Sequence, residues 1–94
     1  MSVKIITADE ELKNIENTQL KRLIVISRMH ALATSPFEEE LQQTMYKCWL
    51  ELANAFLTNA DLRAAVSKCE QSLRSKYQNN ILVQSFLELS KKLL

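Results

Sequence analysis

The 94-residue sequence contains no glycine and a single proline, Pro36. Folds rich in β-structure and the phosphate-binding loops of α/β proteins depend on glycine for tight turns and for close approach of the backbone to a ligand. Residues that favour helices, such as Leu, Ala, Lys, Glu and Gln, are plentiful instead. The composition therefore predicts an all-α protein, and the length suits one helical domain over residues 1–94.

Other scarce features argue against several functional classes. The longest apolar run has four residues, Leu23 to Ile26, whereas a membrane-spanning helix needs about 20. The formal net charge is only +1, which lacks the basic excess typical of a dedicated DNA-binding protein. The N-terminus shows no signal-peptide hydrophobic region. We therefore expect a protein without a membrane span, located in the cytoplasm, for which nucleic acid is a disfavoured partner.

The side chains that usually carry catalysis are also few. His30 is the only histidine, and no carboxylate or second histidine lies at ligand spacing on its helix. Cys48 and Cys69 cannot form a secreted disulfide framework and are not in a CxxC motif. Both fall inside apolar helical patterns, so we interpret them as core residues, with a redox pair as the alternative. We expect no enzymatic activity, no metal and no cofactor.

Apolar spacing and capping residues together predict four helices, preceded by an extended lead-in over residues 1–7. The helix starts are predicted at capping residues in four places: Thr7 with Glu10, Ser35 with Pro36 and Glu38, Asn59, and the stretch Gln78-Asn79-Asn80. The helices should cover residues 8–33, 36–57, 60–77 and 80–93, each to within a few residues. A break in the first helix near Asn17 and Thr18 remains open at this point, because that stretch is polar.

Two stretches carry more apolar residues than one helix face requires. Helix 36–57 has a single apolar face, from Phe37 to Phe56, whereas the turn from Leu23 to Ile26 is apolar all round. The last helix carries two apolar stripes: Leu82, Phe86, Leu89 and Leu93 on one, and Val83, Leu87 and Leu94 on the other. Since four short helices do not comfortably hide this much apolar surface, the pattern favours a groove that binds another helix, with plain core packing as the alternative.

Residues 46–79 resemble one tetratricopeptide repeat, a helix–turn–helix unit of 34 residues. Trp49, Leu52, Ala53 and Phe56 match the signature W-x-x-L-[GA]-x-x-[YF], and Ala65 matches the small residue early in the second helix. The sequence departs from the family pattern at three positions: Cys69 replaces an aromatic residue, Ser72 replaces a small residue, and Tyr77 lies where proline is usual. The resemblance covers about a third of the chain, and the preceding residues do not repeat it.

The resemblance implies a tight antiparallel hairpin. Ala53 and Ala65 would let the two helix backbones approach closely, and Trp49 and Phe56 would close the interface between them. Because such repeats normally stack in numbers, a single one needs the flanking helices to cover its two faces.

The expected function is that of a small interaction module. At the level of the fold, single-repeat helical proteins of this kind resemble the small chaperones of type III secretion, which implies an adaptor or chaperone. Such a protein would hold a helical segment of another protein, or a second copy of itself, through apolar helix faces. The residues expected to bind the partner are Met45, Trp49, Leu52, Val83, Phe86, Leu87 and Leu94.

The alternative function is that of a small nucleic-acid-associated regulator, with helix 60–77 as the recognition element. The residues that would contact phosphates are Arg63, Lys68, Arg74 and Lys76. Acidic neighbours such as Asp61 and Glu70 favour a solvated helix face instead.

Overall fold

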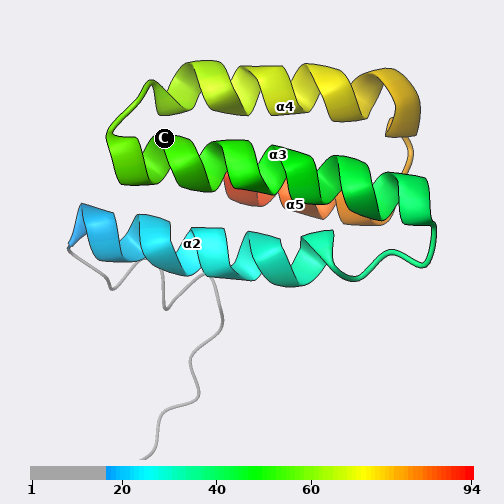
Figure 1. The fold of residues 1–94 in the computed structure, drawn as a ribbon, viewed down its shortest axis with the longest axis horizontal. Coiled ribbons are helices and arrows are strands. Elements are labelled where there is room, and N and C mark those ends of the chain that lie inside the picture. The colour runs from blue at the N-terminus through cyan, green and yellow to red at the C-terminus, as the bar shows by residue number, and fades with distance from the viewer. Residues whose placement is uncertain (1–16) are drawn as a thin grey trace, which may run out of the picture.

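The computed structural model describes residues 17–94, and this part of the chain is entirely helices and short links. The helices are α2 (Thr18–Ala33), α3 (Glu39–Thr58), α4 (Leu62–Tyr77) and α5 (Ile81–Lys91). Successive helices run in opposite directions (Figure 1). The predicted all-α, four-helix arrangement is confirmed, whereas the lead-in over residues 1–7 and the cap predicted at Thr7 lie outside the described residues.

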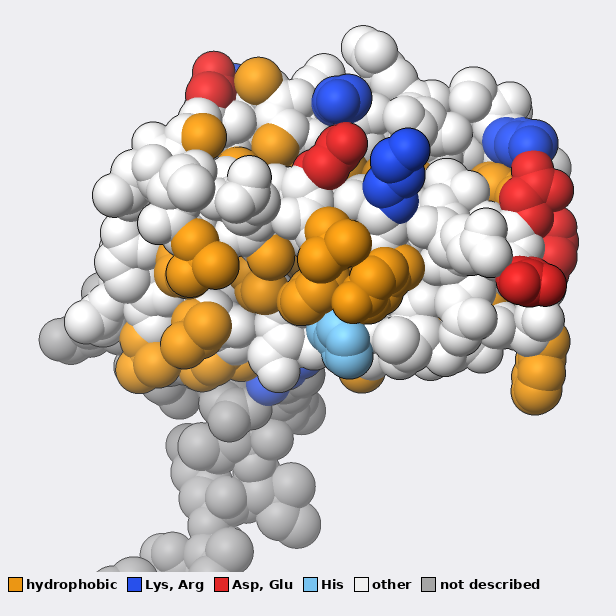
Figure 2. Space-filling model, viewed as in Figure 1, with side chains coloured by type: hydrophobic (Ala, Val, Ile, Leu, Met, Phe, Trp, Pro, Cys, Tyr) orange, Lys and Arg blue, Asp and Glu red, His pale blue; other side chains and the backbone are white. Residues whose placement is uncertain are grey.

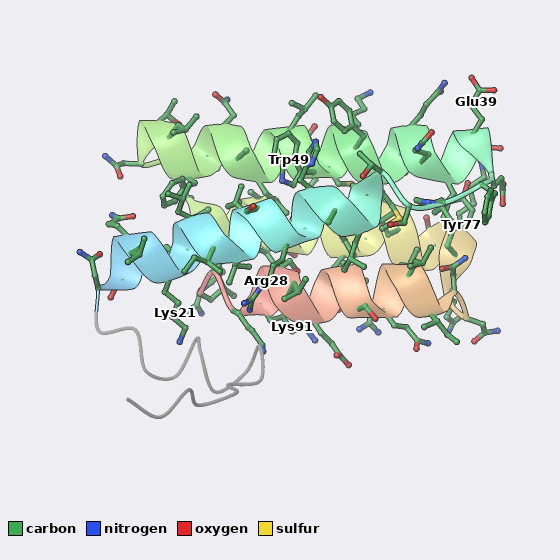
Figure 3. All side chains as sticks on the ribbon, turned by 90° about the horizontal axis from the view of Figure 1, so that it is seen from below. Lys21, Arg28, Glu39, Trp49, Tyr77 and Lys91 are labelled. Atoms are coloured by element: carbon green, nitrogen blue, oxygen red, sulfur yellow. The ribbon has the colours of Figure 1, made fainter. Side chains whose placement is uncertain are left out.

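The four helices form a closed bundle. Helix α2 packs against both α3 and α5, and α4 packs against the same two helices (Figures 1 and 3). In a stack of repeats each unit contacts only its neighbours, so the first and last helices would stay apart. Here α5 returns to α2, and the Arg22 Nε–H donates a hydrogen bond to the Leu93 carbonyl at 2.8 Å. The chain therefore closes on itself instead of leaving the hairpin α3–α4 open at both sides.

Closure explains the two apolar stripes of the last helix. Val83, Phe86 and Leu87 are all buried, because α5 lies between α2 and α4. The core draws on all four helices and on the residue Leu93 that follows α5: Val25, Ile26, Met29, Ala33, Leu41, Met45, Cys48, Leu52, Val66, Cys69, Leu73, Val83, Phe86, Leu87 and Leu93. Within the apolar turn from Leu23 to Ile26, Leu23 is exposed, so that turn is not buried all round.

Asparagine side chains cap the N-termini of two helices, α2 and α5. Asn17 has extended backbone angles and its side chain accepts a hydrogen bond from the Leu20 N–H at 3.1 Å. The described part of the helix predicted over residues 8–33 therefore begins at Thr18, and residues 8–16 lie outside the described residues. Within the stretch 78–80 that was predicted to cap the last helix, Asn80 is the cap, since its side chain accepts from the N–H groups of Leu82 and Val83 at 2.9 and 3.2 Å.

The start predicted at Ser35 is wrong. Helix α3 begins at Glu39, and the preceding Glu38 makes no side-chain capping bond. The Ser35 hydroxyl donates instead to the Ala31 carbonyl at 2.7 Å. The Ser35 hydroxyl thus gives a hydrogen-bond donor to a carbonyl in the last turn of α2. Pro36 is a buried residue of the link and not the first residue of a helix.

Asn59 was expected to begin the third helix, but it ends the second. Its backbone is left-handed, with φ 57° and ψ 31°, and the Ala60 N–H donates to the Ala55 carbonyl at 2.9 Å. Asparagine tolerates this conformation better than other residues with a Cβ, and the sequence offers no glycine for the position. Asp61 begins α4, where its side chain accepts from the Ala64 N–H at 3.2 Å.

We expect Asn80→Ala to lower the free energy of unfolding by about 1 kcal/mol, because two N–H groups of α5 lose their acceptor. In a domain of this size that loss corresponds to a decrease in Tm of about 4–8 °C. Asn79→Ala is the matched control, since Asn79 is exposed and lies one residue before the cap. Thermal unfolding followed by circular dichroism measures both, and equal losses in the two variants would contradict the capping role.

Candidate interaction surface

Exposed apolar side chains gather on one face of the bundle, over α2 and α3 (Figure 2). Leu23, Leu50 and Leu57 are 52%, 46% and 76% exposed. We define the α2–α3 face by these residues and the apolar residues beside them: Leu20, Leu23, Tyr46, Trp49, Leu50, Ala53 and Leu57. A contiguous apolar surface of this kind on a soluble domain is typical of an interaction site.

Helical spacing places these residues side by side. Leu20 and Leu23 are three positions apart on α2, and on α3 the sequence from Tyr46 through Leu50 to Leu57 follows the 3–4 spacing of a single helix face. Since α2 and α3 pack together in opposite directions, their two stripes form one surface. From Tyr46 to Leu57 it is about 16 Å long, which matches roughly three turns of a partner helix.

An aromatic cluster fixes the centre of this surface. The rings of His30 and Trp49 are 4.7 Å apart in a T-shaped arrangement, and those of Tyr46 and Trp49 are stacked at 5.6 Å. The Trp49 Nε1–H donates to the Ile26 carbonyl on α2 at 2.8 Å (Figure 3). Trp49 therefore joins α2 to α3, a contact that the resemblance to a repeat did not predict.

Most of the residues expected to bind a partner are inaccessible in this bundle. Five of the seven are buried in the core: Met45, Leu52, Val83, Phe86 and Leu87. A partner could reach them only if the helices separated. Leu94 is 54% exposed but lies at the end of the chain, beyond α5. Of the seven, only Trp49 belongs to the α2–α3 face.

The sequence interpretation missed the other residues of this face. A signal for two of them was present, because Leu50 and Leu57 fall off the stripe of α3 that is buried, which consists of Leu41, Met45, Cys48, Leu52 and Ala55. Leu20 and Leu23 could not be separated from the buried Val25 and Ile26 without knowing which side of α2 meets the other helices. Phe37, expected on the apolar face of α3, is instead fully exposed in the link before it.

Three of the four residues considered for phosphate contacts are paired with acids. The pairs are Lys68 with Glu51 at 3.5 Å, Arg74 with Glu70 at 3.0 Å, and Lys76 with Glu40. The hydrogen bond and the negative charge of Glu40 raise the pKa of Lys76 above its usual value. Arg63 is exposed near the start of α4. The paired carboxylates offset the positive charge that phosphate binding would need.

Residues 17–94 show neither a metal-ligand cluster nor a membrane-spanning helix. Within that range, no three side chains of His, Cys, Asp or Glu come together in a way that could hold a metal ion. Nor does any helix in the same range combine the length and the apolar content needed to cross a membrane.

No protein-family model, curated protein or solved structure matches this chain. The resemblance of residues 46–79 to a tetratricopeptide repeat therefore stays a prediction that rests on the residues alone.

Proposed function

We propose that this chain is a small non-enzymatic protein–protein interaction module that binds an α-helix on its α2–α3 face. The helix comes from another protein or from a second copy of the chain. The observation that carries the proposal is the contiguous exposed apolar surface over two packed helices, with Trp49 at its centre.

The chemistry of the face suits helix binding. None of its seven residues is charged, and the centres of protein interfaces are likewise depleted in charge and enriched in Trp and Tyr. Two neighbouring helices present parallel rows of side chains, and a third amphipathic helix can lay its apolar face along the groove between them. The hydrogen bond and ring contacts of Trp49 hold its side chain in place before binding, which reduces the entropy lost on association.

The resemblance of residues 46–79 to a tetratricopeptide repeat supports an adaptor or chaperone as the form of this function. The likeness to chaperones of type III secretion lies at the level of the fold, and it favours the cytoplasm as the place of action. The exposed apolar surface agrees with a protein that is bound to a helical partner for part of its lifetime.

We expect the double variant Leu50→Glu, Leu57→Glu to weaken partner binding at least about 100-fold, because two charges would have to be buried in an apolar contact. Thermal stability should change little, since both side chains are exposed in the bundle. Ile81→Glu is the matched control, because Ile81 is 77% exposed at the start of α5 and does not belong to the α2–α3 face.

Two measurements test this expectation. Sedimentation velocity of the purified chain over a range of concentrations detects association of two copies. Crosslinking in cells of the source organism, followed by mass spectrometry, compares the partners retained by the wild type and by each variant. The proposal requires that one of these associations is lost in the double variant and kept in Ile81→Glu. An unchanged set of associations in both variants would refute it.

A further inference from the structure

The only two cysteines of the chain meet across the interface between α3 and α4. They are 21 positions apart in the sequence, and the Cys69 thiol donates to the Cys48 carbonyl at 3.5 Å. For each thiol, the largest influence on its pKa is the other thiol. Both are free thiols. A disulfide can join two cysteines that face each other across packed helices when their Cα atoms lie within about 7 Å.

Access to the two sulfur atoms is unequal. A hollow of about 350 Å³ opens onto one of them, and its walls are formed by Thr44, Lys47, Cys48, Glu51, Lys68 and Ser72. Cys48 lies in this wall and keeps 6% of its surface exposed, whereas Cys69 is completely buried behind it. A small molecule entering the hollow therefore meets Cys48 first.

The pKa values of the two thiols are shifted in opposite directions. The interaction with the Cys69 thiol lowers the pKa of the Cys48 thiol. Burial and the negative charge of Glu51 oppose this, the positive charges of Lys68 and Lys47 support it, and the net shift of the pKa is downward. The same interaction and burial raise the pKa of the Cys69 thiol. Since the thiolate is the nucleophile in exchange reactions, Cys48 is the more reactive of the two.

We propose that Cys48 and Cys69 form a reversible internal disulfide, in which Cys48 reacts first with a small-molecule disulfide and Cys69 then completes the bond. The Cys48 thiolate attacks one sulfur of a low-molecular-weight disulfide, forms a mixed disulfide and releases one small thiol. Cys69 loses its proton and attacks the Cys48 sulfur, which releases the second small thiol. Two electrons and two protons pass from the protein to the oxidant, which becomes two thiols.

The bond would fasten α3 to α4. It closes a loop between cysteines that are 21 positions apart, and a crosslink of that span restricts the unfolded chain enough to raise Tm by roughly 13–27 °C. None of the residues around the hollow belongs to the α2–α3 face. An experiment can therefore refute the disulfide proposal without refuting the proposed function, and the reverse also holds.

The test uses oxidised glutathione as the small disulfide. The folded chain is incubated with mixtures of oxidised and reduced glutathione, free thiols are alkylated, and the intact mass is measured. The wild type should lose two hydrogen atoms, carry no glutathione and show the higher Tm. Cys69→Ser should keep glutathione on Cys48, because the completing thiol is absent. Cys48→Ser should react at Cys69 at least roughly tenfold more slowly than Cys69→Ser reacts at Cys48.

Denaturant supplies the matched control, because the two single variants should react at similar rates once the fold is lost. Cys→Ala variants replace the Cys→Ser variants if circular dichroism shows that a buried hydroxyl unfolds the chain. Three results would overturn the proposal: stable glutathione adducts on the wild type, disulfides between chains in place of the internal one, or equal rates for the two folded variants.

Discussion

Phe86→Ala should lower the free energy of unfolding by about 3–5 kcal/mol, which is most of the stability of a typical small domain. Phe86 is completely buried and is the largest fully buried side chain of the described residues. Its removal leaves a cavity in the middle of α5, at the place where this helix contacts both α2 and α4. The lost contacts and the cavity both destabilise the folded state, because the packed helices can only partly close the cavity.

Phe37→Ala provides the matched control, because the same side chain is truncated at a fully exposed position in the link before α3. We expect its effect to stay within about 0.5 kcal/mol. Urea unfolding followed by circular dichroism gives both values, with the slope m showing whether the transition remains comparable. If Phe86 belonged to an exposed partner-binding stripe, as the sequence suggested, its truncation would resemble that of Phe37, and the closed bundle would be refuted.

The example of α5 shows how far sequence patterns can lead. The spacing of Leu82, Val83, Phe86 and Leu87 identifies a helix with two apolar stripes, and a helix is present there. The same residues would suit an exposed groove or a position between two neighbouring helices. The choice depends on whether α5 packs back on α2, a contact between residues as distant as Arg22 and Leu93. Local periodicity carries no information about such a contact.

Helix starts were predictable only to within a few residues. The polar stretch 78–80 was expected to cap the last helix, and Asn80, which directly precedes Ile81, is the cap. Ser35 and Asn59 lie next to the end of one helix and three or four positions before the start of the next, and their polar side chains or tolerant backbones can serve either end. Both belong to the helix before them, because the last turns of α2 and α3 also need partners for their carbonyl groups.

The candidate interaction surface was predictable only in part. A helix face that binds a partner and one that packs in the core have the same composition, so Met45 and Leu52 were assigned to binding although both are completely buried. Apolar residues that depart from the main stripe, such as Leu50 and Leu57, carry more information about exposure. Once the buried stripe of α3 is known, these off-stripe leucines identify the surface.

Trp49→Ala should lower the free energy of unfolding by about 2–4 kcal/mol, near the lower end for tryptophan because the ring is only half-buried. The variant loses ring contacts with His30 and Tyr46 and the hydrogen bond to the Ile26 carbonyl. Trp49→Phe keeps an aromatic ring but loses the N–H donor and part of the ring, so its loss should be smaller, about 1–2 kcal/mol. Urea unfolding measures both variants.

A double-mutant cycle with His30→Ala then tests the contact between α2 and α3 directly. The coupling free energy between Trp49 and His30 should be about 0.5–1.5 kcal/mol, and a value near zero would contradict the ring contact. Hydrogen exchange locates the weakened part of the fold. If Trp49 joins α2 to α3, Trp49→Ala should speed exchange in α2 more than in α4. The opposite order would mean that Trp49 supports the hairpin α3–α4, as the resemblance to a repeat implies, and that residues 46–79 behave as a repeat-like unit within the bundle.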